Sequence, residues 1–336
     1  MLKLPTHDRY RYLPITKRSH YDWPGARRLA FYIGLNIEHF AFMAGRGNDP
    51  FQGTDATQTQ RNFAWRDYGL RVAVWNVFDM LDDLKMPATI LLNSLVCEHY
   101  PDVIDRIKQR GDDVCAHGRT NAEALSGLWE HDEARIIAET TDTITRHLGT
   151  RPLSWMGPGA GESRVTPDLL VEAGYTHSLG WPVDDQPIWM RTRSGPLLSV
   201  PYPMELNDMG TNVNRDQSGR EFADMIVDQF DEMIEQSDKR PLVMSIALHP
   251  FICGQPFRLR PLRRALAHCA GHVRRDQVWF TRAGDIAKHC MGLPEGTLAK
   301  PCKVVCDHRI MMQVRATASL QNLACRARRN VETAVH

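Results

Sequence analysis

Apolar runs of strand length alternate along the chain with segments whose apolar residues recur at helical spacing. The predicted strands are residues 29–35, 88–92, 113–117, 153–157, 175–179, 197–200, 242–248 and 277–280. The predicted helices are residues 65–84, 101–110, 132–148, 166–170, 221–235, 261–270 and 281–289. Connections of helix length between successive strands indicate a parallel sheet covered by helices. An α/β fold of about seven strands, a closed or nearly closed β/α barrel, suits this pattern better than an open sheet.

Changes in composition and in hydrophobic periodicity along the chain predict three segments. Residues 1–27 hold Tyr, Pro, Arg and His without a clean period, and we interpret them as an N-terminal arm over the outside of the domain. Residues 28–293 carry the strand–helix alternation and form the predicted catalytic barrel. Residues 294–336 lose the periodicity and remain an unassigned C-terminal extension. Within the barrel, the polar segment 44–61 is long enough to be a functional loop, such as a lid over a pocket.

The extension contains two cysteines and a histidine in close succession, Cys302, Cys306 and His308. They could contribute to a zinc site, but two thiols and one imidazole do not complete a four-ligand structural site. We favour the simpler interpretation, an extension outside the core.

Composition narrows the class of protein. The chain has 336 residues, of which 43% are hydrophobic and 24% charged, and its formal net charge is +1. These values are typical of a soluble globular protein, and the small net charge argues against nucleic acid or an anionic membrane as partner. The sequence shows no secretory signal and no membrane-length apolar window. Its eight scattered cysteines favour buried thiols in a reducing, cytoplasmic setting.

Polar side chains follow three of the predicted strands at the point where each strand ends. Glu38 and His39 follow the first strand, His117 ends the third, and His249 ends the run 242–248. Ligands of α/β folds bind at the carboxyl ends of strands, so we expect these groups to meet. A carboxylate and imidazoles can together activate water and protonate a departing nitrogen, which is what hydrolysis of an amide requires. The competing interpretation is that Glu38 and His39 merely begin a solvated loop.

Taken together, the motifs resemble those of the polysaccharide-deacetylase (NodB-homology) superfamily of carbohydrate esterase family 4, and most of all its allantoinase-type branch, which is similar to the cyclic-imide hydrolases. The stretches that carry the resemblance are 35–38 (LNIE), 113–118 (DVCAHG), 149–155 (GTRPLSW), 184–189 (DDQPIW), 200–202 (VPY) with 207–209 (NDM), and 244–249 (MSIALH). The resemblance covers roughly residues 10–292. It implies a distorted barrel, a small-molecule substrate, hydrolysis of a non-peptide carbon–nitrogen bond, and a homo-oligomer.

The departures from the family pattern bear on the metal. The deacetylases carry an Asp–Asp pair where this chain has Glu38 and His39, and a second histidine where it has Asn121. An amide oxygen is a poor ligand for a transition metal. We therefore favour a site without a cofactor; the alternative is a divalent ion such as zinc, with His39 and His117 among its ligands.

We assign roles as hypotheses. Glu38 is the general base for water, and His249 is the general acid or a donor to the oxyanion. His117 orients water or holds a metal. Arg151 pairs with Glu38 and keeps it ionised, because a nearby guanidinium lowers the pKa of a carboxylate.

The expected substrate-binding residues are Arg119, Asn121, Trp155 and Trp189, and the two indoles would wall a pocket around a flat ring. Two other functions remain open from the sequence. One is a metal-dependent deacetylase of N-acetylated sugars. The other is a catalytically degenerate member that binds a small molecule.

Overall fold

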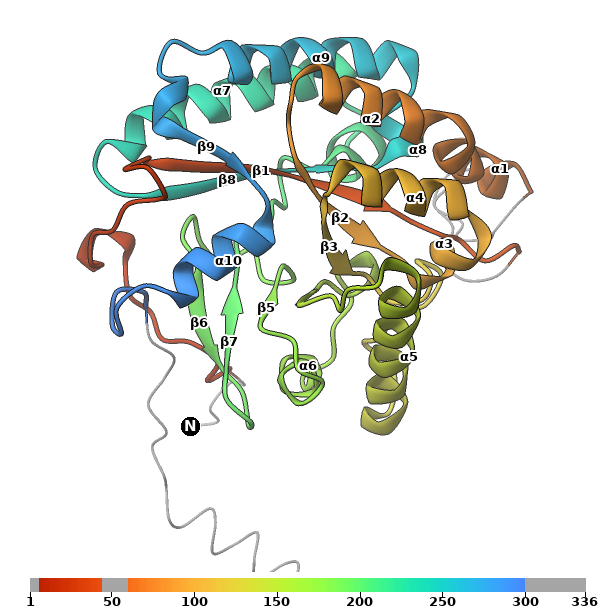
Figure 1. Ribbon diagram of the computed structural model, residues 1–336, viewed down its shortest axis with the longest axis horizontal. Coiled ribbons are helices and arrows are strands. Elements are labelled where there is room, and N and C mark those ends of the chain that lie inside the picture. The colour runs from red at the N-terminus through yellow and green to blue at the C-terminus, as the bar shows by residue number, and fades with distance from the viewer. Residues whose placement is uncertain (1–5, 44–59, 300–336) are drawn as a thin grey trace, which may run out of the picture. The chain divides into compact units, whose positions relative to one another are not determined.

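A single curled sheet organises the protein, for which the computed structural model describes residues 6–43 and 60–299 (Figure 1). The strands are β1 (Leu29–Ile37), β2 (Ala88–Leu92), β3 (Asp113–Ala116), β4 (Ser154–Trp155), β5 (His177–Ser178), β6 (Ile188–Arg191), β7 (Pro196–Ser199), β8 (Leu242–Leu248) and β9 (Val278–Thr281). Their order is β6-β7-β5-β4-β3-β2-β1-β8, and β9 pairs with the first half of β1. All pairs are parallel except β6 with β7. The sheet is a half-barrel, and the prediction of an α/β barrel of mostly parallel strands is confirmed.

The open side of the half-barrel is bridged by loops. Val243 on β8 donates its backbone N–H to the carbonyl of Asp185, and Ala247 donates to that of Leu206. The sequence pattern did not separate β6 from the turn-rich segment before it, because a short edge strand after several prolines carries little periodicity.

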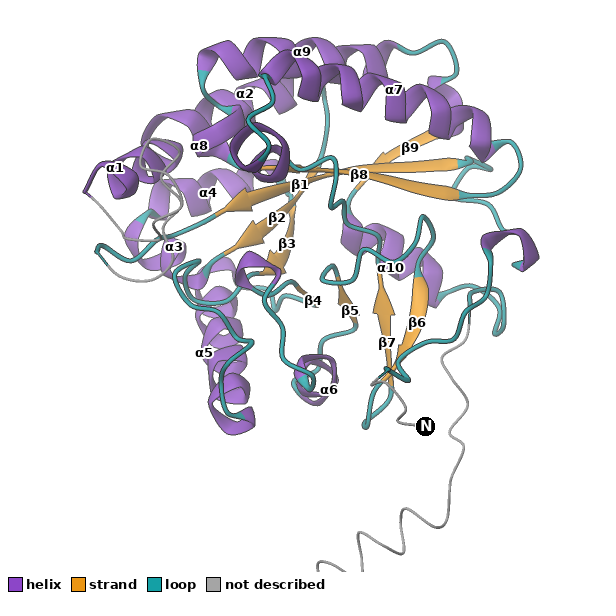
Figure 2. Ribbon diagram, turned by 180° about the vertical axis from the view of Figure 1, so that it is seen from behind, coloured by secondary structure: helices purple, strands orange, loops and turns teal. Residues whose placement is uncertain are grey.

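Helices cover the outer face of the sheet (Figure 2). The described helices are α1 (Gln60–Tyr68), α2 (Val74–Asp83), α3 (Ser94–His99), α4 (Pro101–Arg110), α5 (Glu130–Leu148), α6 (Thr166–Glu172), α7 (Gly219–Ser237), α8 (Pro250–Cys253), α9 (Pro256–Gly271) and α10 (Ala283–Met291). Of these, α10 packs its buried residues against the core inside the half-barrel. One π-helical turn, Gly69–Ala73, joins α1 to α2. α7 and α9 lie side by side over β8 and β1. Among the described helices, none is long and apolar enough to cross a lipid bilayer.

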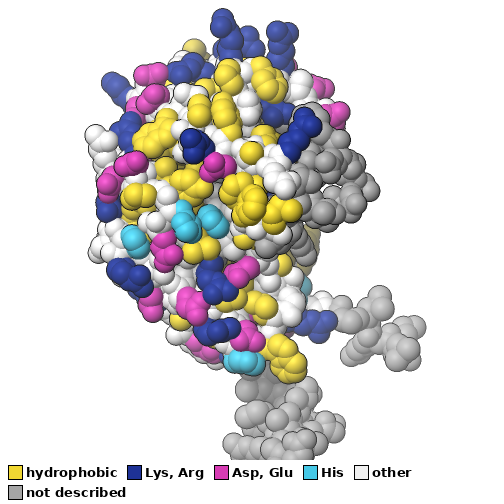
Figure 3. Space-filling model, turned by 90° about the vertical axis from the view of Figure 1, so that its right-hand side faces the viewer, with side chains coloured by type: hydrophobic (Ala, Val, Ile, Leu, Met, Phe, Trp, Pro, Cys, Tyr) yellow, Lys and Arg dark blue, Asp and Glu magenta, His cyan; other side chains and the backbone are white. Residues whose placement is uncertain are grey.

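β1 is buried along its whole length and sets the two faces of the sheet. Alternate residues such as Leu29 and Phe31 join the core under the helices, whereas Ala30 and Tyr32 join the core inside the half-barrel. Continued past the strand, this alternation points Glu38 to the inside. Figure 3 looks onto the side toward which β1 ends, where histidine and acidic side chains lie among hydrophobic ones.

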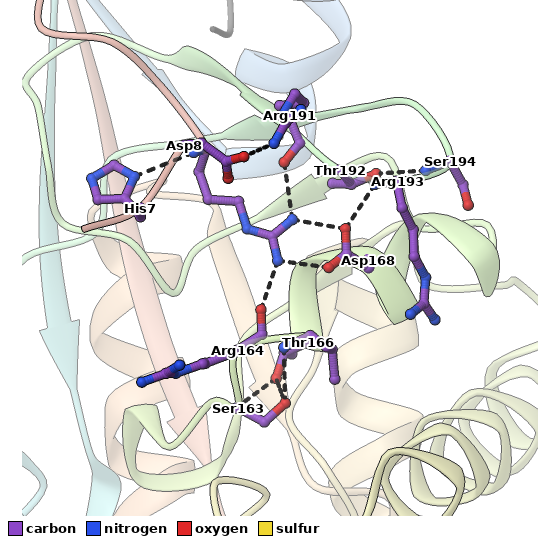
Figure 4. Close-up of polar contacts among 12 residues, drawn as sticks. His7, Asp8, Ser163, Arg164, Thr166, Asp168, Arg191, Thr192, Arg193 and Ser194 are labelled. Atoms are coloured by element: carbon purple, nitrogen blue, oxygen red, sulfur yellow. Dashed lines mark hydrogen bonds and ion pairs between the residues drawn. The ribbon is translucent and has the colours of Figure 1, made fainter. Parts of the chain in front are cut away.

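The described part of the N-terminal arm, residues 6–27, is held by two arginines. Arg9 forms a two-pronged bond to the carboxylate of Asp168 at 2.7 and 2.6 Å, and Arg18 reaches Asp184 at 2.7 Å. Figure 4 draws Asp168 accepting also from the backbone N–H of Arg193 at 2.7 Å. The arm thus lies against α6 and the β6–β7 hairpin.

Several predictions from the sequence concern segments that lie wholly or partly outside the described residues. These are the loop 44–61 up to residue 59, the extension 294–336 from residue 300 onward, and the partial zinc motif with Cys302, Cys306 and His308. The five cysteines within the described residues, Cys97, Cys115, Cys253, Cys269 and Cys290, are buried free thiols.

Candidate active site

Three residues from separate strand ends meet inside the half-barrel. Oε1 of Glu38 lies 3.5 Å from Nε2 of His117 and 3.6 Å from Nε2 of His249. All three side chains are buried, with at most 8% of each exposed. From the sequence we expected Glu38, His117 and His249 to lie close together. The structure brings them together at the carboxyl ends of β1, β3 and β8.

His249 is fixed from its other side by Asp208. The carboxylate of Asp208 accepts the backbone N–H of His249 at 2.8 Å and lies 2.6 Å from its ring Nδ1. Burial acts to lower the pKa of His249, but the charges of Glu38 and Asp208 outweigh it and raise that pKa to about 10. His249 is therefore an imidazolium near neutral pH, with its Nε2–H directed at Glu38.

Glu38 is held ionised by the same pair of imidazoles. Burial acts to raise its pKa, and the charge of His249 with contacts from both histidines lowers it to about 2. Its second oxygen, Oε2, is buried and has no hydrogen-bond partner among the described residues. A buried carboxylate oxygen without a partner is costly, so this atom is where a water or a substrate donor is best placed.

His117 is oriented by the end of the neighbouring strand. Its Nδ1 lies 2.7 Å from the carbonyl oxygen of Met156, which can only accept, so Nδ1 carries a hydrogen and Nε2 faces Glu38. The next residue, Gly118, has φ +69°, and a Cβ there would lie 2.4 Å from Cγ of Pro158. Only glycine suits this turn, which keeps His117 close to the glycine-rich loop after β4.

His39, expected as a metal ligand, points elsewhere. Its backbone N–H donates to Oδ1 of Asn93, its Nδ1 lies 3.1 Å from Oγ1 of Thr120, and its ring stacks on His99 at 5.1 Å. Among the described residues, Glu38, His117 and His249 also do not bring three donor atoms within 4.8 Å of one another. Among the described residues, His39 and His117 therefore do not belong to a group of three close ligand atoms at this site.

Arg151 does not pair with Glu38, and that prediction was wrong. The residue precedes β4 at the amino end of the sheet, is exposed, and donates to the carbonyl of Ala173. Its neighbours around a surface hollow there include Asp113 and Arg282. The histidines, not a guanidinium, keep the carboxylate of Glu38 ionised.

The expected substrate-binding residues are scattered. Trp155 is fully buried under the helices against Tyr175, with ring centroids 5.5 Å apart, so it cannot wall a pocket inside the half-barrel. Trp189 lies on β6 and packs against the inner core. Arg119 is engaged in surface ion pairs, at 2.6 Å with Glu123.

Asn121 lies nearer to the site. Its backbone N–H donates to the carbonyl of His39 at 2.8 Å, and its Oδ1 is buried without a hydrogen-bond partner among the described residues. It remains a predicted substrate contact.

Sequence reasoning missed two residues beside the site. Asp208 was part of a noted motif, but it lies in a loop before a π-helical turn, where no strand pattern points to a role. Arg66 on α1 is 5% exposed, its Cζ lies 3.8 Å from the ring centroid of Phe40, and it lines a small cavity together with Glu38 and Tyr100. The buried residues of α1 are Asn62 and Arg66, so no apolar helical pattern pointed to this side of the helix.

The chain is similar to known proteins in sequence and in fold. The polysaccharide deacetylase family model matches residues 65–178. A putative polysaccharide deacetylase of Schizosaccharomyces pombe is 26% identical over 304 residues, which are 79% of this chain and 91% of that protein. Over most of its length the chain is similar to proteins of the polysaccharide deacetylase superfamily.

Two solved structures are similar to this chain over most of its length. A Puue allantoinase is 27% identical with a TM-score of 0.72, over 80% of this chain and 92% of that one. A probable polysaccharide deacetylase from Pseudomonas aeruginosa PAO1 is also 27% identical, with a TM-score of 0.70, over 80% of this chain and 93% of that one. These similarities indicate a hydrolase of the deacetylase type.

Proposed function

We propose that this hydrolase cleaves the carbon–nitrogen bond of a small, cyclic amide, imide or ureide by direct attack of water. The observation that carries the proposal is the position of Glu38, an ionised carboxylate between two imidazoles with one oxygen still unpartnered. Such a group can accept a proton from water without a metal.

The protonation states of Glu38, His249 and His117 define the roles that we propose for them. Oε2 of Glu38 accepts a hydrogen bond from water and takes its proton as the oxygen attacks the substrate carbonyl carbon. His249, held as an imidazolium by Asp208, donates its Nε2 proton to the departing nitrogen as the C–N bond breaks. His117 faces the same carboxylate and fixes the position of the attacking water. The proton on Glu38 then returns through solvent to His249, which restores the site.

The surroundings of Glu38 favour a small substrate. Glu38 is 6% exposed, and the cavity that it lines is bounded by the side chains of Phe40, Arg66 and Tyr100. This cavity, about 10 Å³, has room for about one water, so only a small group can approach the carboxylate. The resemblance to an allantoinase structure supports the same class.

A second candidate is a metal-dependent deacetylase of N-acetylated sugars. It is favoured by His117, whose Nδ1–H is bonded to a backbone carbonyl so that Nε2 is directed inward, the usual arrangement behind a metal-ligating histidine. In that case His117 and Glu38 are the two described residues that would hold a divalent ion, with further ligands from water or substrate, and the ion would supply Lewis-acid polarisation of the carbonyl.

One panel separates the candidates. Allantoin, hydantoins, succinimide-type imides and N-acetylglucosamine oligomers would be offered to the full chain, with and without EDTA. We expect hydrolysis of a cyclic substrate that EDTA leaves unchanged, and a loss of about 10²–10⁴-fold in the Glu38→Gln variant. Glu235→Gln, an exposed change on α7, is the matched control.

Other outcomes would overturn the proposal. Activity on acetylated sugars that EDTA abolishes would establish the deacetylase instead. Full activity in Glu38→Gln would remove that residue from the mechanism. Absence of any turnover, combined with a cyclic compound that raises the melting temperature, would establish a binding protein.

A further inference from the structure

We propose that Asp231, His268 and His272 form a binding site for a divalent transition-metal ion such as Zn²⁺, which links α7 to α9. The three residues are the group among the described residues whose His, Asp, Glu or Cys ligand atoms all lie within 4.8 Å of one another. The site belongs to the helical layer, away from the strand ends that carry Glu38.

The distances suit a single ion. Oδ1 of Asp231 lies 2.7 Å from Nε2 of His268 and 3.7 Å from Nε2 of His272. Ligands about 2.0–2.1 Å from a tetrahedral zinc ion are roughly 3.3 Å apart, so small side-chain rotations are sufficient. Two imidazoles and a carboxylate are the ligand types that zinc prefers, and they leave a fourth position open to water.

The helices hold the ligands in place. His268 lies in the last turn of α9 and His272 is the residue that follows the helix, with the two ring centroids 5.6 Å apart. The ring of Phe230 on α7 packs edge-on against both imidazoles, with centroids 6.3 Å and 5.6 Å away. Asp231 is the next residue along α7, so the aromatic contact fixes the three donors together.

Binding must displace two hydrogen bonds. The bond between Asp231 and Nε2 of His268 is replaced by bonds to the ion, and the hydrogen on that nitrogen moves to Nδ1 or to solvent. Nδ1 of His272 accepts the backbone N–H of Arg274 at 3.1 Å, and this bond is lost when Nε2 of His272 binds the ion. These costs predict a moderate, micromolar affinity and not the tight binding of a closed structural zinc site.

The test is zinc titration of the full chain after removal of metals with EDTA. We expect isothermal titration to show a zinc site at micromolar concentration, with a rise in melting temperature as zinc is added. Both effects should weaken at least tenfold in the His268→Ala/His272→Ala variant. His131→Ala, which removes another exposed histidine beside an aspartate, should bind zinc as the unaltered protein does.

Asp231→Asn is a milder variant that keeps the side-chain shape and serves if the double variant fails to fold. It should bind zinc more weakly because the negative charge is lost. If zinc does not bind, or binds equally to the unaltered chain and to these variants, the three residues form ordinary ion pairs and the proposal is wrong. A Co²⁺ spectrum of four-coordinate type, absent from the variants, would support it independently.

Discussion

Asp208 binds His249 twice, through the backbone N–H and through the ring Nδ1. The double contact fixes both the position of the residue and the orientation of its imidazole, and the carboxylate also stabilises the positive charge. His249 can therefore act as an acid even at a pH where an ordinary histidine is neutral. This relationship depends on a loop that lies outside the strands, and together with Glu38 it raises the pKa of His249.

Replacing Asp208 with Asn should remove that charge while keeping the shape. We expect kcat/KM to fall by about 10²-fold or more, because the neutral imidazole no longer donates a proton. The alkaline limb of the pH–rate profile should also move to lower pH, since the pKa of His249 loses one of its two raising charges. An unchanged profile measured on a turned-over substrate would show that Asp208 is not the group that charges His249.

The free energy of unfolding should depend on pH through the ionisation of Glu38 and His249. The pKa of Glu38 is lowered from 4.5 to about 2, so its contribution is present above pH 4.5 and is lost as the pH falls toward 2. The pKa of His249 is raised from 6.5 to about 10, so its contribution is present below pH 6.5 and is lost as the pH rises toward 10. Urea unfolding should therefore give a larger free energy of unfolding at pH 5.5 than at pH 9.

The control is the Glu38→Gln/His249→Gln variant, which removes both titrating groups. Its free energy of unfolding should change less between pH 5.5 and pH 9 than that of the unaltered protein. An equal change in both proteins would assign the effect to other groups.

Arg151→Ala should leave catalysis almost unchanged. The residue lies at the amino end of β4, opposite the strand ends that carry Glu38. We expect kcat/KM within about threefold of the unaltered value, a small effect because exposed contacts contribute little. A loss of a hundredfold would show that Arg151 reaches the site in a conformation different from this one.

Gly34→Ala should destabilise the protein and disturb the site. A Cβ at this position would lie 2.7 Å from Cε2 of Tyr202, whose hydroxyl accepts a hydrogen bond from Asn36 at 2.9 Å. We expect a loss of about 1–3 kcal/mol in the free energy of unfolding, as for other overpacked cores. Gly127→Ala is the matched control, because no atom lies within 4 Å of a Cβ there.

Sequence reasoning found the residues that strands position and missed those that loops position. Glu38, His117 and His249 could be predicted because each follows an apolar run, and parallel strands end on one side. Asp208 could not, because nothing in a loop sequence reveals which strand end it approaches.

Two of the errors have a simple geometric cause. Arg151 comes three residues before β4 begins, so it belongs to the amino end, and a strand rise of about 3.3 Å per residue separates it from the carboxyl end. Trp155 pairs with Ala116, one residue before His117, and alternation along β3 places Ala116 on the helix side. Both could have been corrected from the register of the strands, which the sequence alone did not supply.

The register in which β1 pairs with β2, β8 and β9 limits which insertions and deletions the strand can accept. A slip of one position would turn the carboxylate outward beneath the helices and bring Ile37 into the reacting cavity. Insertions or deletions in this strand should therefore abolish turnover even where the chain still collapses into a barrel. The register of β1 with its three neighbouring strands therefore serves both the packing of the core and the position of the reacting carboxylate.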